Sequence, residues 1–294
     1  MAIRSLEALE KACENKNIYD VILEDDCMER GVTREESEKK MADLYAAIQH
    51  SAQNYTPTLR SASGMAGGDG AKMRSYVKAG KTICGEELGQ VIAQALEMGE
   101  NNACMKCIVA APTAGSCGVM PAVLLPYQKR MGLSDEEMVR ALYIAGAIGQ
   151  AVATKASIAG AAGGCQYEIG TASAMAAAAL CYLGGGDAEA ICHAAALAIK
   201  SLLGLVCDPI AGLVEVPCIK RNASGAMVAM CCADMALAGV VGHIPADEVI
   251  DAMAEVGNAM SQDLRETGIG GLAGTPTGRA ICEIVTMNGR EEEA

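Results

Sequence analysis

The 294-residue sequence has no tryptophan and no phenylalanine, and only 3% of its residues are aromatic. β-Sheets favour aromatic and β-branched side chains, so the composition argues against a β-sandwich or barrel. The core must consist of Ala, Val, Ile, Leu and Met, and 33 glycines add to the small side chains that let helices approach closely. We therefore predict a predominantly α-helical, compact fold that is rich in alanine and glycine.

An excess of basic residues is also lacking. The net charge is −13 and the isoelectric point is about 4.7, which argues against nucleic acid as a partner. A mean hydropathy of +0.22 is too apolar for a disordered chain. The charged N-terminus has no apolar centre of a signal peptide, so we expect a cytoplasmic protein.

Long apolar runs without helix breakers are missing as well. The uncharged stretch 107–128 contains Pro112, Pro121 and Pro126, so it cannot form one continuous membrane-spanning helix. Residues 169–186 begin with polar side chains and end in three glycines. We expect no membrane span in either segment.

Helix signals divide the chain into three parts. The glycine-rich loop 61–70 marks the clearest internal boundary. We expect a charged helical segment at 1–55, a catalytic domain at 60–285 that begins with this loop, and an acidic tail at 286–294. Only ten charged residues occur between 141 and 246, so the helices there should be central. Further helices are expected from the capping sequences that begin at Thr33, Ser134 and Pro245, and from apolar spacing over 84–99.

The fourteen cysteines are unusual for a chain that we expect in a reducing compartment. Cys104 and Cys107 form a C-x-x-C pair, but the second half of a zinc site is not visible. Four others lie in alanine-rich helical runs and are interpreted as core residues. These are Cys181, Cys192, Cys231 and Cys232.

Another four cysteines lie beside turn-forming residues, where backbone N–H groups can stabilise a thiolate. They are Cys117, Cys165, Cys207 and Cys218. The gaps of 42 and 11 residues that separate the last three require the tertiary fold to bring them together. An iron–sulfur site is one hypothesis at this point, and ordinary packing is the other.

Five long motifs occur in order between about residues 60 and 280. They are SGMAGGDGAKM (63–73), APTAGSCGVMPAVL (111–124), KASIAGAAGGCQYEIG (155–170), CDPIAGLVEVPCIKRNA (207–223) and ETGIGGLAGTPTG (266–278). Together they resemble the alpha chain of iron–sulfur-dependent L-serine dehydratase. The length and the order of the motifs make the resemblance specific.

The resemblance implies a [4Fe–4S] cluster held by Cys165, Cys207 and Cys218, with glycine-rich loops converging on it. Cys117 lies in a family motif but is not carried over as a ligand. Three ligands leave one iron open to act as a Lewis acid on the hydroxyl of L-serine. A base removes the α-proton, water leaves, and the aminoacrylate breaks down to pyruvate and ammonia without pyridoxal phosphate.

The expected substrate-binding residues are small or polar and follow turns in these motifs, although the same residues could simply serve turns and helix caps. They are Ser63, Gly64, Thr113, Gly115, Ser116, Lys220 and Asn222. No catalytic base is evident. His193 is interpreted as a core residue, and a Ser-His-Thr motif that the family carries on its beta portion is absent here. The resemblance therefore implies a beta-subunit partner that supplies the base.

Three alternatives are kept. A related L-cysteine desulfidase would use the same cluster. A pyridoxal phosphate enzyme could use Lys155 with the glycines 184–186, although that triple glycine is better explained as a helix end. A non-catalytic iron–sulfur sensor or scaffold subunit would bind the cluster without turning over serine.

Overall fold

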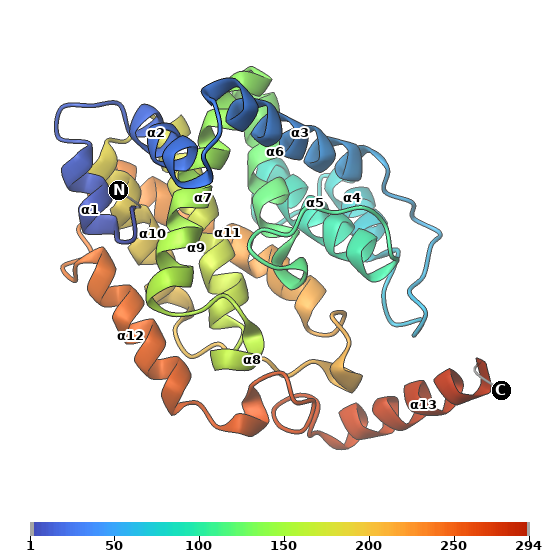
Figure 1. Cartoon of the computed structure of the whole chain (residues 1–294). Helices are drawn as coiled ribbons and strands as arrows, with labels where there is room; N and C mark the ends of the chain where they lie inside the picture. The colour runs from blue at the N-terminus through green and yellow to red at the C-terminus, as the bar shows by residue number, and fades with distance from the viewer. Residues whose placement is uncertain (1–2, 293–294) are drawn as a thin grey trace.

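The computed structural model describes residues 3–292, which form thirteen α-helices and no β-strand (Figure 1). This confirms the predicted all-α class. No helix among these residues is long and apolar enough to cross a membrane. The helices are α1 (Leu6–Ala12), α2 (Ile18–Arg30), α3 (Arg34–Gln53), α4 (Asp69–Lys78), α5 (Gly85–Ala103), α6 (Val119–Met131), α7 (Asp135–Lys155), α8 (Gly160–Gly163), α9 (Thr171–Leu183), α10 (Ala188–Leu202), α11 (Cys218–Leu237), α12 (Ala246–Ala259) and α13 (Pro276–Glu292).

The helix starts agree with the capping sequences. Thr33 and Glu36 form a complete capping box at α3, and Ser134 and Glu137 form another at α7. The helix expected from Pro245 is α12, and the apolar spacing over 84–99 corresponds to α5. At the other end of a helix, the triple glycine terminates α9, as predicted, and Gly185 adopts a φ of +87°.

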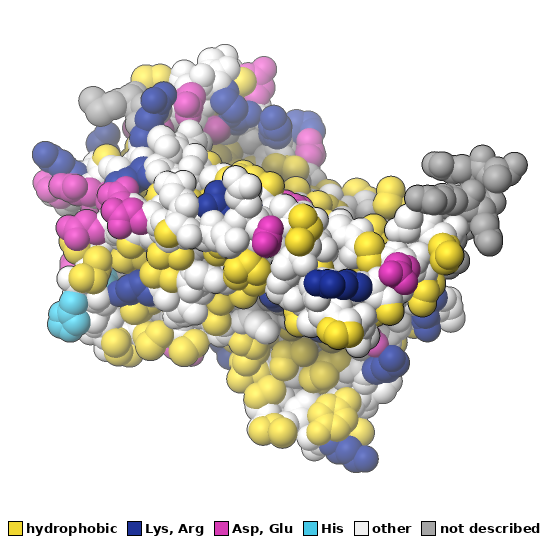
Figure 2. Space-filling model, turned by 90° about the horizontal axis from the view of Figure 1, so that it is seen from below, with side chains coloured by type: hydrophobic (Ala, Val, Ile, Leu, Met, Phe, Trp, Pro, Cys, Tyr) yellow, Lys and Arg dark blue, Asp and Glu magenta, His cyan; other side chains and the backbone are white. Residues whose placement is uncertain are grey.

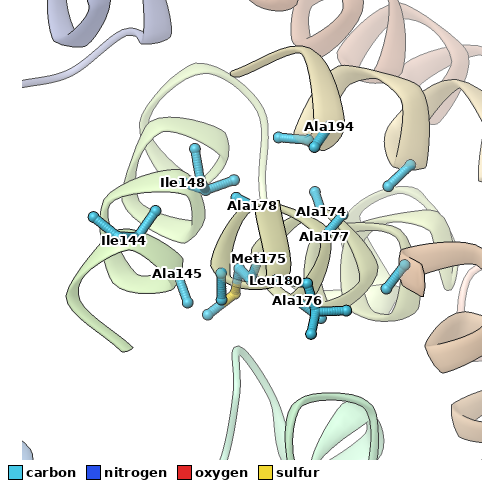
Figure 3. Packing of buried hydrophobic residues seen from close by; sticks show 14 of the residues in the cluster. Ile144, Ala145, Ile148, Ala174, Met175, Ala176, Ala177, Ala178, Leu180 and Ala194 are labelled. Carbon is cyan, nitrogen blue, oxygen red and sulfur yellow. The ribbon is translucent and has the colours of Figure 1, made fainter. Parts of the chain in front are cut away.

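Helix α9 forms the centre of the molecule and packs against α7, α10 and α11. Figure 3 shows its alanine side chains between Ile144 and Ile148 of α7 and Ala194 of α10. Small residues bring the backbones close together: a Cβ on Gly225 of α11 would lie 2.8 Å from Ser173 Oγ of α9. The prediction that the sparsely charged region supplies the central helices is confirmed.

The N-terminal helices complete the same hydrophobic core. Helix α1 packs against α10 and α12, and α2 and α3 pack against α7. At the other end of the chain, α13 projects from the body (Figure 1). Figure 2 shows the molecule from below the view of Figure 1, with hydrophobic side chains scattered among charged ones on this face. The predicted acidic tail begins within α13; residues 293–294 and the side chains of 288–292 lie outside the described part.

Two sequence interpretations are wrong. Cys231 is exposed on α11, whereas its neighbour Cys232 is buried, because composition alone does not say which face of a helix meets the core. His193 is not a core residue: it is partly exposed and lines a surface pocket. Composition concealed this position, because His193 lies between buried Cys192 and Ala194 on an alanine-rich helix.

Candidate functional site

Three cysteines from three separate segments meet at one end of the central helices. Cys165 precedes a π-helical turn, Gln166–Gly170, that continues into α9. Cys207 lies in an extended segment after α10, and Cys218 is the first residue of α11. All three are buried, with exposed fractions of 2%, 2% and 6%. Two of them therefore lie at helix starts, where backbone N–H groups favour negative sulfur.

The side chain of Gln166 holds the first two cysteine segments together. It is fully buried; its Nε2 donates to the carbonyl of Met253 at 3.2 Å, and its Oε1 accepts from the N–H of Gly204 at 3.0 Å. Gly204 is three residues before Cys207, and Gln166 directly follows Cys165. One amide side chain thus fixes the spacing of two motifs that are far apart in sequence.

The last glycine-rich motif closes over Cys207. The N–H of Cys207 donates to the carbonyl of Leu264 at 2.9 Å, and the N–H of Glu266 donates back to Cys207 at 2.7 Å. These backbone hydrogen bonds form an isolated parallel β-bridge between Cys207 and Arg265. The segment 264–266 therefore holds this cysteine in an extended conformation.

A buried ion pair anchors the same region. Asp208, which is 3% exposed, pairs with Arg221 at 2.8 Å and also accepts the N–H of Leu272 at 2.8 Å. Arg221 donates in addition to the carbonyl of Val206 at 2.8 Å. Gly271 is required beside this pair, since a Cβ there would lie 2.5 Å from Asp208 Oδ2. The pair therefore connects α11 to the segment around Val206 and Asp208 and, through Leu272, to the last glycine-rich motif.

The thiols influence one another electrostatically. A hydrogen bond from Cys207 lowers the pKa of Cys165, and the same contact together with burial raises the pKa of Cys207. Burial, followed by the negative charges of Cys165 and Glu168, raises the pKa of Cys218 to about 12. Three thiolates at these positions would repel one another, so a positively charged group among them would stabilise all three.

Cys117 lies apart from this group. Its side chain is fully buried, and its thiol donates to the carbonyl of Met98 on α5 at 3.7 Å. Burial raises its pKa to about 12. This cysteine is a packing residue at the start of α6.

Glu168 is a site residue that the sequence analysis did not single out. Its Oε2 lies 4.0 Å from Cys207 Sγ. Burial raises its pKa, and a hydrogen bond from the Thr113 side chain opposes that effect. The available signal was its position three residues after Cys165, in a region with only ten charged residues.

The predicted turn 113–116 faces this carboxylate. The N–H of Thr113 donates to Ser116 Oγ at 3.3 Å, and Ser116 is fully buried. Asn222, which is 1% exposed, joins the turn to α11: its Nδ2 donates to Gly115 O at 2.8 Å, and its Oδ1 accepts from Gly118 N at 2.8 Å. In the described structure Asn222 therefore shapes the turn.

The predicted loop around Ser63 is held by a second overlooked acid, Glu215. The hydroxyls of Ser61 and Ser63 donate to its Oε2 at 2.8 and 2.6 Å. Gly64 adopts a φ of +77°, which favours glycine. Glu215 is three residues before Cys218, so this loop is attached to the third cysteine segment.

The remaining predicted polar residues lie further out. Lys220 is half-exposed and forms an ion pair with Asp69 at 2.9 Å. His193 and His243 line a pocket of about 440 Å³ beside α10. Lys155 pairs with Asp247 and Asp251; burial opposes its charge, but these carboxylates raise its pKa. A Schiff-base lysine requires the opposite shift.

Comparisons with known proteins point to one family. The family model of the serine dehydratase alpha chain matches residues 13–273. The chain is 45% identical to the probable L-serine dehydratase, alpha chain, of Bacillus subtilis, over 95% of this chain and 93% of that protein. It is 46% identical to the L-serine dehydratase, alpha chain, of Peptoniphilus asaccharolyticus, over 90% and 91%. L-serine dehydratase TdcG of Escherichia coli is 46% identical over 61% of this chain, which corresponds to only 40% of TdcG.

Proposed function

The chain belongs to the serine dehydratase alpha chain family, and from this premise we propose that it is the cluster-binding subunit of an L-serine dehydratase. The reaction converts L-serine to pyruvate and ammonia. The observation that carries the proposal is that Cys165, Cys207 and Cys218 are three buried thiols from separate segments, with Cys165 close enough to the other two to raise the pKa of both. We assign the catalytic machinery of this subunit to residues 60–285.

The donor set fits an iron–sulfur cluster. Soft thiolate ligands select such clusters, and these three lie beside turns that supply backbone N–H groups. Among the described residues, no three His, Cys, Asp or Glu side chains are arranged to hold a single metal ion. A single ion would draw its ligands to one point about 2.3 Å from each sulfur, whereas each cysteine of a [4Fe–4S] cluster binds a different iron.

A cluster bound by three cysteines keeps one iron open and would supply Lewis-acid activation of the substrate hydroxyl. The chain's own residues orient the substrate around it. We propose that Thr113, Gly115 and Ser116, together with Ser63 and Gly64, bind the substrate carboxylate through hydroxyl and backbone N–H groups. Lys220 and Asn222 follow the third cysteine, and Asn222 acts by fixing the 113–116 turn.

A beta subunit is the proposed partner and the source of the base. The "alpha chain" names of the relatives support a second chain, and this chain corresponds to only 40% of TdcG. Neither His193 nor His243 lies in the cysteine site, since both line the pocket beside α10. The fourteen cysteines, all free thiols in this structure, support a reducing location such as the cytoplasm.

The proposal is tested by anaerobic purification of the chain with and without its beta chain. We expect about four irons and four sulfides per alpha chain, a broad visible absorbance, and release of pyruvate and ammonia from L-serine only when both chains are present. Preferential release of sulfide from L-cysteine would favour the desulfidase alternative. An iron-free, inactive complex from a careful anaerobic preparation would overturn the proposal.

A further inference from the structure

The Glu168 carboxylate lies where the predicted site segments converge. A Cβ on Gly115, in the 113–116 turn, would lie 3.4 Å from its Oε1. A Cβ on Gly160, at the start of α8, would lie 2.9 Å from its Oε2 and 2.9 Å from Cys207 Sγ. Glycine at both positions leaves room beside the carboxylate, since a larger residue at either would place a Cβ within 3.4 Å of its oxygens. The two oxygens thus face two different loops of the site.

The charges around this carboxylate are unbalanced. Within residues 3–292, Glu168 forms no ion pair, and Glu266 adds a second negative charge nearby. The two cations that follow Cys218 are already paired: Arg221 with Asp208 at 2.8 Å and Lys220 with Asp69 at 2.9 Å. The charged form of a partly buried carboxylate is stabilised by a nearby cation. A ligand that carries a cation would supply one.

We propose that Glu168 binds the α-ammonium group of the substrate, an inference that rests on the proposed function. An L-α-amino acid brings one cation into the site, and a charge-assisted hydrogen bond to a partly buried carboxylate is stronger than a neutral one. The 113–116 turn lies against one oxygen of this carboxylate, since a Cβ on Gly115 would be 3.4 Å from Oε1. The site therefore selects amino acids over the corresponding hydroxy acids.

The physical reason for this selectivity is the cost of an unpaired group. A hydroxy acid places a neutral hydroxyl where the ammonium would lie, so the partly buried carboxylate loses its counterion. Sites that hydrogen-bond a specific group reject analogues without it, because their own polar groups are then left without a partner. Glu168→Gln keeps the size of the side chain but removes its charge.

The experiment uses the anaerobic alpha–beta complex and two unreactive probes. L-Alanine carries the ammonium and L-lactate carries a hydroxyl in its place, and neither has a β-leaving group. We expect the wild-type complex to bind alanine at least about 100-fold more tightly than lactate in calorimetry. In Glu168→Gln, alanine binding should weaken by roughly 10- to 100-fold, while lactate binding changes by less than about threefold.

The controls separate the possible failures. Glu255→Gln, an exposed acid on α12, should retain the wild-type preference. Iron content and absorbance without a probe should be unchanged in Glu168→Gln; a loss of iron would assign Glu168 to the cluster instead and overturn the inference. Unaltered selectivity in Glu168→Gln also overturns it. A wild-type complex that binds neither alanine nor serine would overturn the proposed function itself.

Discussion

Buried cysteines occur in two regions of this molecule with different surroundings. In the helical core, Cys181, Cys192 and Cys232 pack among alanine and leucine, and burial raises the pKa of Cys181 and Cys232 to about 11. At the site, Cys165 and Cys207 influence each other's pKa, Cys207 lies 4.0 Å from Glu168, and Asp208 of the Asp208–Arg221 pair follows Cys207 directly in the chain. Both groups are almost inaccessible to solvent, so burial does not distinguish a packing cysteine from a candidate ligand.

The two regions are also stabilised differently. The core is held by small apolar side chains in close contact, as in the packing of α9 against α7 and α10. The site is held by buried polar side chains that bridge loops: Gln166, Asn222, Glu215 and the Asp208–Arg221 pair. Removal of a methyl group weakens the first kind of region, whereas removal of one charge strands its partner in the second.

The largest difference should appear when cysteines of the site and of the core are each replaced by alanine. We expect Cys165→Ala, Cys207→Ala or Cys218→Ala each to lose most of the iron and at least about 1000-fold of serine turnover, because each removes a proposed ligand. Cys181→Ala should retain both. Anaerobic iron and sulfide analysis with an activity assay measures the difference. Equal iron content in the two groups of variants would remove the functional distinction between the regions.

The next effect concerns the buried ion pair. Arg221→Met leaves Asp208 buried without its cation, and we expect a loss of about 3 kcal/mol in the free energy of unfolding. Lys220→Met breaks the half-exposed pair with Asp69 and should cost less than about 1 kcal/mol. Urea unfolding measures the free energy of unfolding of both variants. An unchanged m value shows that the substitution altered stability alone. Similar losses of unfolding free energy in the two variants would mean that burial does not increase the contribution of the Asp208–Arg221 pair to stability.

A smaller effect is expected in the core. Gly225→Ala places a Cβ 2.8 Å from Ile169 Cγ2 and Ser173 Oγ, and such overpacking costs roughly 1–3 kcal/mol. Iron binding should be preserved. Ser224→Ala, at the neighbouring exposed position of α11, is the matched control and should unfold like the wild type. Loss of iron in Gly225→Ala without loss of stability would contradict the separation of core and site.

The smallest effect concerns a partly buried ion pair. The Lys155 ammonium lies 3.4 Å from Asp247 and 3.2 Å from Asp251, and its pKa is raised above 10.5, since these carboxylates outweigh the effect of burial. Its stabilisation is therefore fully present below pH 10.5 and is lost as the pH rises through the folded-state pKa. We expect Lys155→Met to cost less than about 1 kcal/mol at pH 8.

The pH dependence provides the check for this variant. The difference in unfolding free energy between wild type and Lys155→Met should shrink above pH 10.5. Lys129→Met, an exposed position on α6, serves as the control and should show no such trend. A difference that grows with pH would show that the two carboxylates do not stabilise the ammonium.

The helix starts were predictable because capping is local. The Thr33 and Ser134 boxes use residues three apart, so the sequence contains every group that takes part. The orientation of a side chain on a nearly uniform apolar helix was not predictable. Cys231 and Cys232 are neighbours in the same alanine-rich run, yet only the second faces the core. Their sequence surroundings are the same, and only the packing of α11 against neighbouring helices decides which of the two is buried.

The sequence by itself determined the all-α class, the starts of α3, α7 and α12, and the cysteine motifs, because composition, caps and motif order are properties of short segments. Only the tertiary structure decided which distant groups meet. The proximity of Glu168 to Cys207, and the attachment of Ser63 to Glu215, depend on contacts across 39 and 152 residues. The fold determines such contacts through the packing of whole helices, so no local pattern could reveal them.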